Sequence, residues 1–562
     1  MPALSVGAAA PSTALDIEKG AGPRRLPSWW VLATLLVLAA ALRLSTLDLQ
    51  SFWYDEAYTP VHVLHSSLTA TLRSVVHSEN SPPLWYLLAW LDARVLGDGE
   101  IALRLPSALA GIATVAVAWG IGRELAGARA AAACAALVAV NPLFVWYSQE
   151  ARVYALFVLL SALAMLCFLR AHAQPTRGRM AAFALCGSLA LLTHYFSVFL
   201  LVPMVLVLVA DPAVRRAALP AAGVMAAVGA GLLPLIIAQG GHHTQWIGRW
   251  ALTSRLQAIP QYFLTGYSGA PLGHSVEALI AAPIIALLAL GACCLAPVAA
   301  ANVRSRSSPS PSRPAPSRDA GAGAGAGVAQ AAQLALLLAG FGVLAPIVLA
   351  ALGADYLAPR NLVAAMIPVS ALIAVSFAAS VSGSAPRTGR ASASGDGGAA
   401  GVASPPRRPP PWAGQAALGL IALTLLAFVA VSVNVNLSPR LQRGNWRGLA
   451  RVLREGSGGQ RAITTVELGA APLEYYLAPL RNAPRGATLT VAEIDETGYA
   501  PLRRSAGRAP APGFSLTERR SIDGLILYRF HSVRPRTVSE SRLRRHVITR
   551  ARPEVLIAAR AA

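Results

Sequence analysis

The sequence is poor in charged residues and almost without lysine. Only 13% of its 562 residues are charged, 55% are hydrophobic, and Lys19 is the single lysine. So few charged groups cannot cover the surface of an ordinary water-soluble protein of this length. We therefore expect most of the chain to lie in lipid.

Acidic residues are also scarce, with 26 against 48 basic residues and a net charge of +22. Nucleic-acid binding would require the basic residues to gather on a water-exposed domain. Many arginines instead stand in short loops between apolar runs, as the positive-inside rule places them. We therefore expect no nucleic-acid partner.

All five cysteines fall inside apolar runs, which excludes a disulfide framework of the kind found in small secreted proteins. They are Cys134, Cys167, Cys186, Cys293 and Cys294.

Eleven apolar segments are long enough to cross a bilayer. They lie near 29–47, 101–122, 128–147, 151–170, 180–195, 196–211, 217–238, 276–300, 330–352, 361–381 and 413–433. A shorter apolar stretch, 82–97, carries Asp92 and Arg94. If this stretch does not cross, the arginine clusters of the connecting loops all fall on the N-terminal, cytoplasmic side. We therefore predict about eleven transmembrane helices, with 82–97 lying as a helix in the outer interface.

This topology divides the chain into a cytoplasmic tail, 1–28, and a transmembrane domain, 29–433, whose first external loop is 48–100. Two cytoplasmic connections, 301–329 and 382–411, are rich in Ser, Pro, Gly, Ala and Arg. Such compositions predict disordered linkers without chemistry.

The composition changes to a polar mixture after Val433. A helix-like segment at 445–456 and strand-like segments at 461–468 and 524–530 predict a small external α/β domain over 434–562. Its arginine-rich end is expected to be a solvated or headgroup-facing tail.

Polar residues that interrupt the apolar pattern collect on the predicted outer side. They belong to the motifs WYDEAYT (53–59), SQEARVY (148–154), THYF (193–196) and DYLAPRN (355–361). Ionisable groups at membrane depth are costly and usually functional.

Each motif also fits a structural explanation. Asp55 and Glu56 are suited to the solvated start of a helix. Arg152 and Arg360 are suited to anchoring at the interface, and His194 to the belt of amphipathic residues there.

In their order these motifs resemble the bacterial protein-O-mannosyltransferase-like and aminoarabinose-transferase-like glycosyltransferases of the GT-C superfamily. The resemblance also includes SPPLWYLL (81–88), GDGEIALRLPSALAG (97–111) and the NWRGLA pattern (445–450), and covers essentially the whole chain. It implies a polyprenyl-monophosphate donor carrying one sugar, and a catalytic acid in the first external loop that maps onto Asp55. The chain departs from the family at Ser81, where His is common, and at Asn361, where an aromatic residue is common.

Sugar transfer to a hydroxyl needs a base for the acceptor proton, and a carboxylate suits this role. We predict Asp55 as that base. Glu56 is the adjacent residue, and on a helix its side chain diverges by about 100°. Glu56 is therefore expected to position the substrate or the neighbours of Asp55.

The leaving phosphate needs stabilisation of its charge, which the forked guanidinium of arginine supplies. Arg152 and Arg360 are the candidates, with Tyr356 as a hydrogen-bond donor. The candidates for substrate binding are Glu150, His194 and Tyr195. The sequence requires no cofactor; a divalent metal held by the loop carboxylates and His194 is an alternative.

The sequence thus predicts a glycosyltransferase of the inner (plasma) membrane that moves a mannose-like sugar to a protein or glycan acceptor of the cell envelope. Its partners would be the polyprenyl-phosphate-linked sugar, the acceptor and membrane lipids. The alternative is a polytopic transporter or lipid flippase. The acidic pair in a long external loop and the external terminal domain favour the enzyme.

Overall fold

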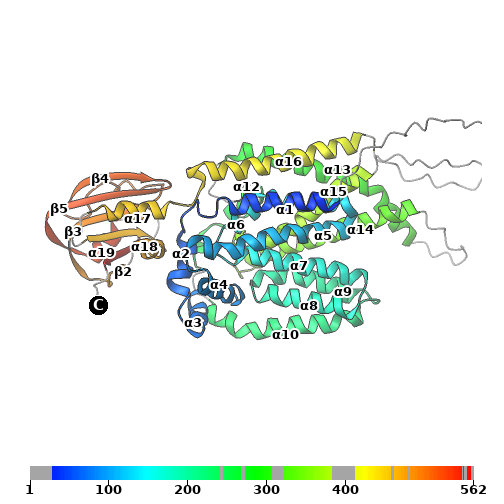
Figure 1. The fold of residues 1–562 in the computed structure, drawn as a ribbon, viewed down its shortest axis with the longest axis horizontal. Coiled ribbons are helices and arrows are strands. Elements are labelled where there is room, and N and C mark those ends of the chain that lie inside the picture. The colour runs from blue at the N-terminus through cyan, green and yellow to red at the C-terminus, as the bar shows by residue number, and fades with distance from the viewer. Residues whose placement is uncertain are drawn as a thin grey trace, which may run out of the picture.

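The computed structural model describes residues 28–240, 245–266, 272–306, 320–382, 410, 412–456, 461–477, 480–546, 548–549 and 553–558. It consists of a long helical bundle with a small sheet domain at one end (Figure 1).

Apolar helices that lie side by side form the bundle (Figure 1). They are α1 (Ser28–Leu44), α5 (Glu100–Val140), α6 (Pro142–Ser148), α7 (Tyr154–Ala173), α8 (Arg177–Leu191), α9 (Val198–Ala210), α10 (Arg215–Gln239), α13 (His274–Arg306), α14 (Ala320–Ala351), α15 (Met366–Ser382) and α16 (Trp412–Leu437). Within the described residues, seven helices are long and apolar enough to cross a membrane, and α1 and α9 are shorter apolar helices. The predicted fold class, a polytopic helical membrane protein with a C-terminal sheet domain, is confirmed.

Each of the eleven predicted segments coincides with a helix or with part of one. Segments 101–122 and 128–147 correspond to the two halves of α5 and to α6, because α5 bends at Ala126 and Gly127. Gly127 has a φ of +76°, which favours glycine. A Cβ added at Gly122 would lie 2.4 Å from the carbonyl oxygen of Ala130. The two halves of α5 therefore pack against each other at the bend. The count of eleven crossings stays a prediction.

Short helices lie at the end of the bundle that carries the sheet domain (Figure 1). They include α2 (Tyr54–Tyr58), the π-helical turn η1 (Thr59–Val63), α3 (Leu68–Ser78) and α4 (Leu84–Val95). In Figure 1, α2 lies nearest to the sheet domain, and α3 and α4 lie at the same end of the bundle. The 12 residues of α4 give a length of about 18 Å, too short to cross a bilayer. This length agrees with the interfacial helix predicted at 82–97.

Further short elements are α11 (Gln245–Arg249) and α12 (Leu252–Thr265), together with the 3-10 turns η2 (Tyr195–Ser197), η3 (Pro359–Ala365) and η4 (Pro439–Leu441). Of these, η2 and η3 carry residues that the sequence marks as site candidates.

The sheet domain holds six strands in the order β2-β6-β1-β3-β5-β4. Its elements are α17 (Trp446–Arg454), β1 (Arg461–Val466), α18 (Ala470–Leu477), β2 (Leu480–Asn482), β3 (Thr488–Gly498), β4 (Ser515–Ile522), β5 (Leu525–Ser539), α19 (Glu540–Arg545) and β6 (Pro553–Ala558). β1 and β3 are parallel, and the other pairings are antiparallel.

The arginine-rich end is not the solvated tail that we predicted. Residues 534–539 continue β5, and β6 lies between β2 and β1 within the sheet. Val555 and Leu556 of β6 are buried. The apolar run of β6 is only a few residues long, and the arginines on both sides of it dominate the local composition.

The predicted linkers are described only at their edges. Helix α13 extends to Arg306 and α14 begins at Ala320, so both ends of the segment 301–329 are helical. The rest of that linker, 307–319, and nearly all of 382–411 lie outside the described residues.

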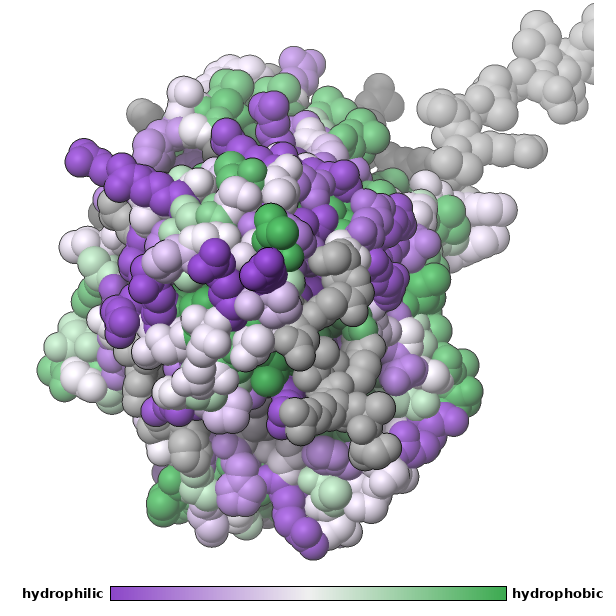
Figure 2. Space-filling view, turned by 90° about the vertical axis from the view of Figure 1, so that its left-hand side faces the viewer, coloured by the Kyte–Doolittle hydropathy of each residue, from purple (hydrophilic) through white to green (hydrophobic). Residues whose placement is uncertain are grey.

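The two ends of the molecule differ in surface polarity. Figure 2 looks onto the end that carries the sheet domain, where hydrophilic and intermediate residues cover most of the visible surface. Large apolar side chains such as Leu206, Leu233 and Leu426 are exposed along the bundle, as helices in contact with lipid require. The sheet domain therefore belongs in water and the bundle in the membrane.

Candidate active site

The polar motifs meet at the end of the bundle that carries the sheet domain. There α1 leads into α2, α5 and α7 begin, η3 precedes α15, and α16 leads into α17. Side chains from segments hundreds of residues apart form a cluster of carboxylates and guanidinium groups at this junction.

Glu56 and Arg104 form a fully buried ion pair. The Arg104 Nε donates to Glu56 Oε1 at 2.8 Å, and its Nη2 donates to Oε2 at 2.7 Å. Arg104 also donates to the carbonyl oxygens of Leu47 and Gln50, and Glu56 Oε1 accepts the N–H of Ala151 at 2.9 Å. Glu56 therefore fixes α2 to the start of α5 and to the chain before α7.

The pKa of Glu56 is set by two opposing effects. Burial by itself raises it, but the positive charges of Arg104 and Arg443 and the hydrogen bonds of the carboxylate lower it below its usual value. The carboxylate is thus kept ionised inside the protein. We predicted that Glu56 positions the substrate or the neighbours of Asp55. In the structure its carboxylate contacts Arg104, Arg443 and the N–H of Ala151.

Asp55 points away from Glu56, as helix geometry predicts. Its Oδ2 accepts a hydrogen bond of 2.6 Å from Nη1 of Arg360 in η3, and both side chains are partly exposed. The Arg360 guanidinium carbon lies 6.0 Å from the centroid of the Tyr154 ring. The predicted base and a predicted phosphate ligand, 305 positions apart in sequence, are therefore direct neighbours.

Arg152, the other predicted phosphate ligand, is held by a carboxylate that the sequence analysis did not select. It donates to both oxygens of Glu79, at 3.2 and 3.0 Å, and to Thr59 Oγ1 at 3.3 Å. Glu79 is buried at the end of α3. The sequence feature that could have identified Glu79 is its position in the first external loop, next to the Ser-Pro-Pro motif.

Glu150, predicted to bind substrate, is buried against Arg443. Its Oε2 accepts from Arg443 Nη2 at 3.3 Å, and its Oε1 has no hydrogen-bond partner in the described part of the chain. Burial raises the pKa of Glu150. Arg443 comes from the connection between α16 and α17, and no sequence motif singled it out.

A further ion pair shapes the loop that precedes Arg360. Arg255 of α12 donates to both oxygens of Asp355, at 2.6 and 2.7 Å, and to the carbonyl oxygen of Leu357 at 2.9 Å. Tyr356, a predicted phosphate ligand, lies between Asp355 and Leu357 in the chain and is 51% exposed. Its carbonyl oxygen accepts from the side-chain amide of Asn361 at 3.1 Å.

His194 and Tyr195, the remaining predicted substrate ligands, point in different directions. His194 is buried, stacks on Phe157 with ring centroids 4.5 Å apart, and accepts the N–H of Phe196 at Nδ1. The Tyr195 hydroxyl donates to Gln239 Oε1 at 2.7 Å. The structure therefore places His194 near the Tyr154 ring, 6.1 Å away, and joins Tyr195 to the end of α10.

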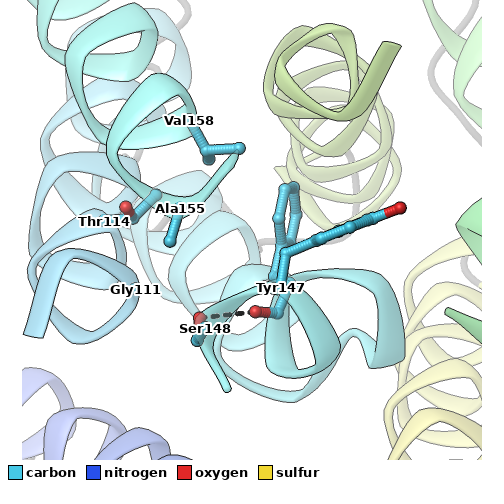
Figure 3. Close-up of a pocket in the computed structure, with 7 residues that line it drawn as sticks. Gly111, Thr114, Tyr147, Ser148, Ala155 and Val158 are labelled. Atoms are coloured by element: carbon cyan, nitrogen blue, oxygen red, sulfur yellow. Dashed lines mark hydrogen bonds between the residues drawn. The ribbon is translucent and has the colours of Figure 1, made fainter. Parts of the chain in front are cut away.

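A cavity lies among α5, α6 and α7. It is lined by Gly111, Thr114, Phe144, Tyr147, Ser148, Ala155 and Val158. Figure 3 shows Ser148 among these lining residues. Its hydroxyl donates to the Phe144 carbonyl at 2.5 Å. Because no charged side chain lines this cavity, we place the chemistry in the charged cluster instead.

The carboxylates of the cluster do not form a metal-ion group. Among the residues the structure describes, no three His, Cys, Asp or Glu side chains gather to hold an ion. Each acid of the cluster faces a guanidinium group instead, whose charge repels a cation.

Because the Glu56–Arg104 pair is buried, we predict that breaking it lowers the stability of the protein. Removing one partner of a buried ion pair costs about 3–5 kcal/mol, because the other charge stays buried and unpaired. Arg104→Gln should therefore lower the melting temperature of the purified protein clearly. The control is Arg170→Gln, which breaks the exposed Arg170–Glu124 pair and should change little. Equal shifts for the two variants would contradict this account of the loop.

Comparisons with known proteins agree with the motifs. Residues 80–238 match the family model of dolichyl-phosphate-mannose-protein mannosyltransferases. No curated protein sequence matches the chain.

Among solved structures, the chain is similar to ArnT from Cupriavidus metallidurans in the apo state, with 14% identity and a TM-score of 0.48 over 89% of this chain and 98% of that one. The same protein bound to undecaprenyl phosphate gives 13% identity and a TM-score of 0.47, over 90% of this chain and 98% of that one. The chain is also similar to the oligosaccharyltransferase AglB from Archaeoglobus fulgidus, with 14% identity and a TM-score of 0.40. This match covers 80% of this chain and 59% of AglB.

Over residues 80–238 the chain is therefore similar to the dolichyl-phosphate-mannose-protein mannosyltransferases, and its ordered motifs resemble those of the GT-C superfamily of membrane glycosyltransferases.

Proposed function

We propose that this protein transfers a single sugar from a polyprenyl-phosphate donor to an acceptor of the cell envelope, with Asp55 as the general base. The observation that carries the proposal is the 2.6 Å contact between Asp55 and Arg360. It joins a carboxylate, which can accept a proton, to a guanidinium group, which can bind a phosphate, at the end of the bundle that carries the sheet domain (Figure 1). The family match supports the reaction class.

In the proposed reaction, the acceptor hydroxyl gives its proton to the Asp55 carboxylate as its oxygen bonds to the anomeric carbon of the sugar. The bond between that carbon and the phosphate oxygen breaks, and the lipid phosphate leaves with the electron pair. Arg360 stabilises the negative charge of the leaving group through its forked donors. Asp55 then returns its proton to water.

The Asp55–Arg360 pair also suggests how the donor prepares the base. Without donor, each group satisfies the other. A phosphate bound to Arg360 competes with Asp55 for the same guanidinium, which frees the carboxylate to accept a proton. Both side chains keep some exposure to solvent, unlike the buried Glu56–Arg104 pair, so this exchange does not require the bundle to open.

The two predicted phosphate ligands are therefore given different roles. Arg360 is the principal phosphate ligand, and the exposed Tyr356, four positions before it in the chain, is a hydrogen-bond donor. Arg152 is occupied by both oxygens of Glu79. We assign Arg152 to supporting the wall of the site through that pair, with a weaker electrostatic effect on the phosphate.

The family description supports mannose as the sugar, and the acceptor would be a protein Ser or Thr, a glycolipid or a wall polysaccharide. We propose the inner (plasma) membrane as its location, with the site and the sheet domain outside. The position of the arginine-rich loops supports this orientation.

Release of polyprenyl phosphate from a radiolabelled mannosyl lipid by purified protein tests the function. General-base catalysis contributes about a hundred- to ten-thousand-fold, so Asp55→Asn should lose most turnover. The control variant Asp98→Asn, which changes an exposed acid of the same loop, should keep normal turnover. Normal turnover by Asp55→Asn would show that Asp55 is not the base. A wild-type protein that moves the intact lipid without releasing phosphate would favour a flippase.

Cysteine labelling tests the orientation. In a background without the native cysteines, Val533→Cys introduces a thiol at a sheet-domain position that is 95% exposed. Gly178→Cys places one at the start of α8, where an added Cβ meets open space. An impermeant thiol reagent applied to intact cells should label position 533 and not position 178. The reverse pattern would invert the proposed topology.

A further inference from the structure

The connection between α16 and the sheet domain enters the charged cluster through Arg443. The Arg443 side chain is 3% exposed. Its guanidinium donates to the carbonyl oxygen of Gln149 at 3.1 Å and to Glu150 Oε2 at 3.3 Å. It also lies 3.6 Å from Glu56 Oε2. One arginine from outside the bundle therefore contacts both buried acids next to Asp55.

Aromatic rings hold this guanidinium in place. Its carbon lies 4.3 Å from the centroid of the Trp146 ring and 5.9 Å from that of Trp53. Such contacts favour a cation over an aromatic face. Because the Arg443 side chain is almost fully buried, water screens its interaction with the two acids only weakly.

The backbone around Arg443 is fastened to the first external loop. The Arg443 N–H donates to Gln50 Oε1 at 2.9 Å. The Trp446 N–H donates to Ser51 Oγ at 2.9 Å, and that hydroxyl donates to the Gly444 carbonyl at 3.1 Å. The connection is thus tied to the residues that lead into Asp55.

The charges at this point balance. Glu56 and Glu150 supply two buried negative charges, and Arg104 and Arg443 supply two positive ones. Loss of Arg443 would leave one buried carboxylate without a partner directly beside the catalytic loop. An unpaired buried charge is costly, so the loop would move or the acid would take up a proton.

We propose that Arg443 is a positioning residue, through which the connection to the sheet domain holds Glu56 and Glu150 together and keeps Asp55 opposite Arg360. This inference rests on the proposed function, because it assumes that Asp55 is the base. It gives the connection between α16 and the sheet domain a part in catalysis without any contact to substrate.

The inference predicts a change in pH dependence. Burial raises the pKa of Glu150 and Arg443 opposes that rise. The other titratable groups that interact with it are Glu56 and Asp55 of α2, Arg360 of η3, Arg104 of α5, Tyr147 of α6 and Tyr154 of α7. Without Arg443 the pKa of Glu150 should rise further. In a variant without Arg443, Glu150 is neutral at pH values below this pKa, so no unpaired charge is buried. Above it an unpaired charge appears, so the variant should lose activity as pH increases.

The test compares Arg443→Gln, Arg443→Lys, Glu150→Gln and the double variant Arg443→Gln/Glu150→Gln. The control is Arg451→Gln, at an exposed position of α17. We measure kcat and the donor KM for lipid-phosphate release across a pH series. A misplacement of about 1 Å can cost on the order of a hundredfold. Arg443→Gln should therefore lose about ten- to a hundredfold in kcat at alkaline pH, with little change in KM. Arg443→Lys should lose less, and Arg451→Gln nothing.

Rescue distinguishes positioning from a loss of fold. The double variant lacks both charges, so it should recover most of the kcat and lose the alkaline sensitivity. If Arg443→Gln and the double variant are equally impaired at every pH, the inference is wrong, even though the wild type remains active. Normal turnover by Asp55→Asn would overturn the proposed function instead, and that result does not depend on the Arg443 variants.

Discussion

The buried ion pair between Glu56 and Arg104 determines where Asp55 can be. Two charges removed from water persist only when they satisfy each other, and Arg104 uses its remaining donors on carbonyl oxygens of the chain before α2. The first external loop is thereby fixed to the start of α5. Since adjacent side chains on a helix diverge, fixing Glu56 inside the bundle turns Asp55 outward, toward Arg360.

The same constraint explains the other polar contacts at this end of the molecule. Acids and arginines occur here as Glu79–Arg152, Glu150–Arg443 and Asp355–Arg255 pairs, and each joins segments distant in sequence. Arginine suits such pairs because its planar fork matches a carboxylate with two hydrogen bonds. The Asp55–Arg360 pair differs because both of its side chains keep access to solvent. It is therefore the pair at which an anionic substrate can exchange with a protein carboxylate.

The apolar segments, the sheet domain and the end of the bundle at which the polar motifs gather could be predicted from the sequence, because they depend on local hydrophobicity and loop charge. It did not reveal which acid meets which arginine. Glu79, Arg255 and Arg443 were missed because their partners lie far away in the chain and no periodicity marks them. Strand β3 was missed for a related reason: its buried acids, Glu493 and Asp495 among them, interrupt the apolar pattern that identifies a strand.

The central claim is that Asp55 and a donor phosphate compete for Arg360. The most direct test measures binding of polyprenyl phosphate to purified wild-type protein and to Asp55→Asn, with Asp98→Asn as the control. Because the amide no longer pairs with the guanidinium as an ion, Asp55→Asn should bind the lipid phosphate more tightly than the wild type, although it has lost turnover. Equal or weaker binding by Asp55→Asn would contradict the claim.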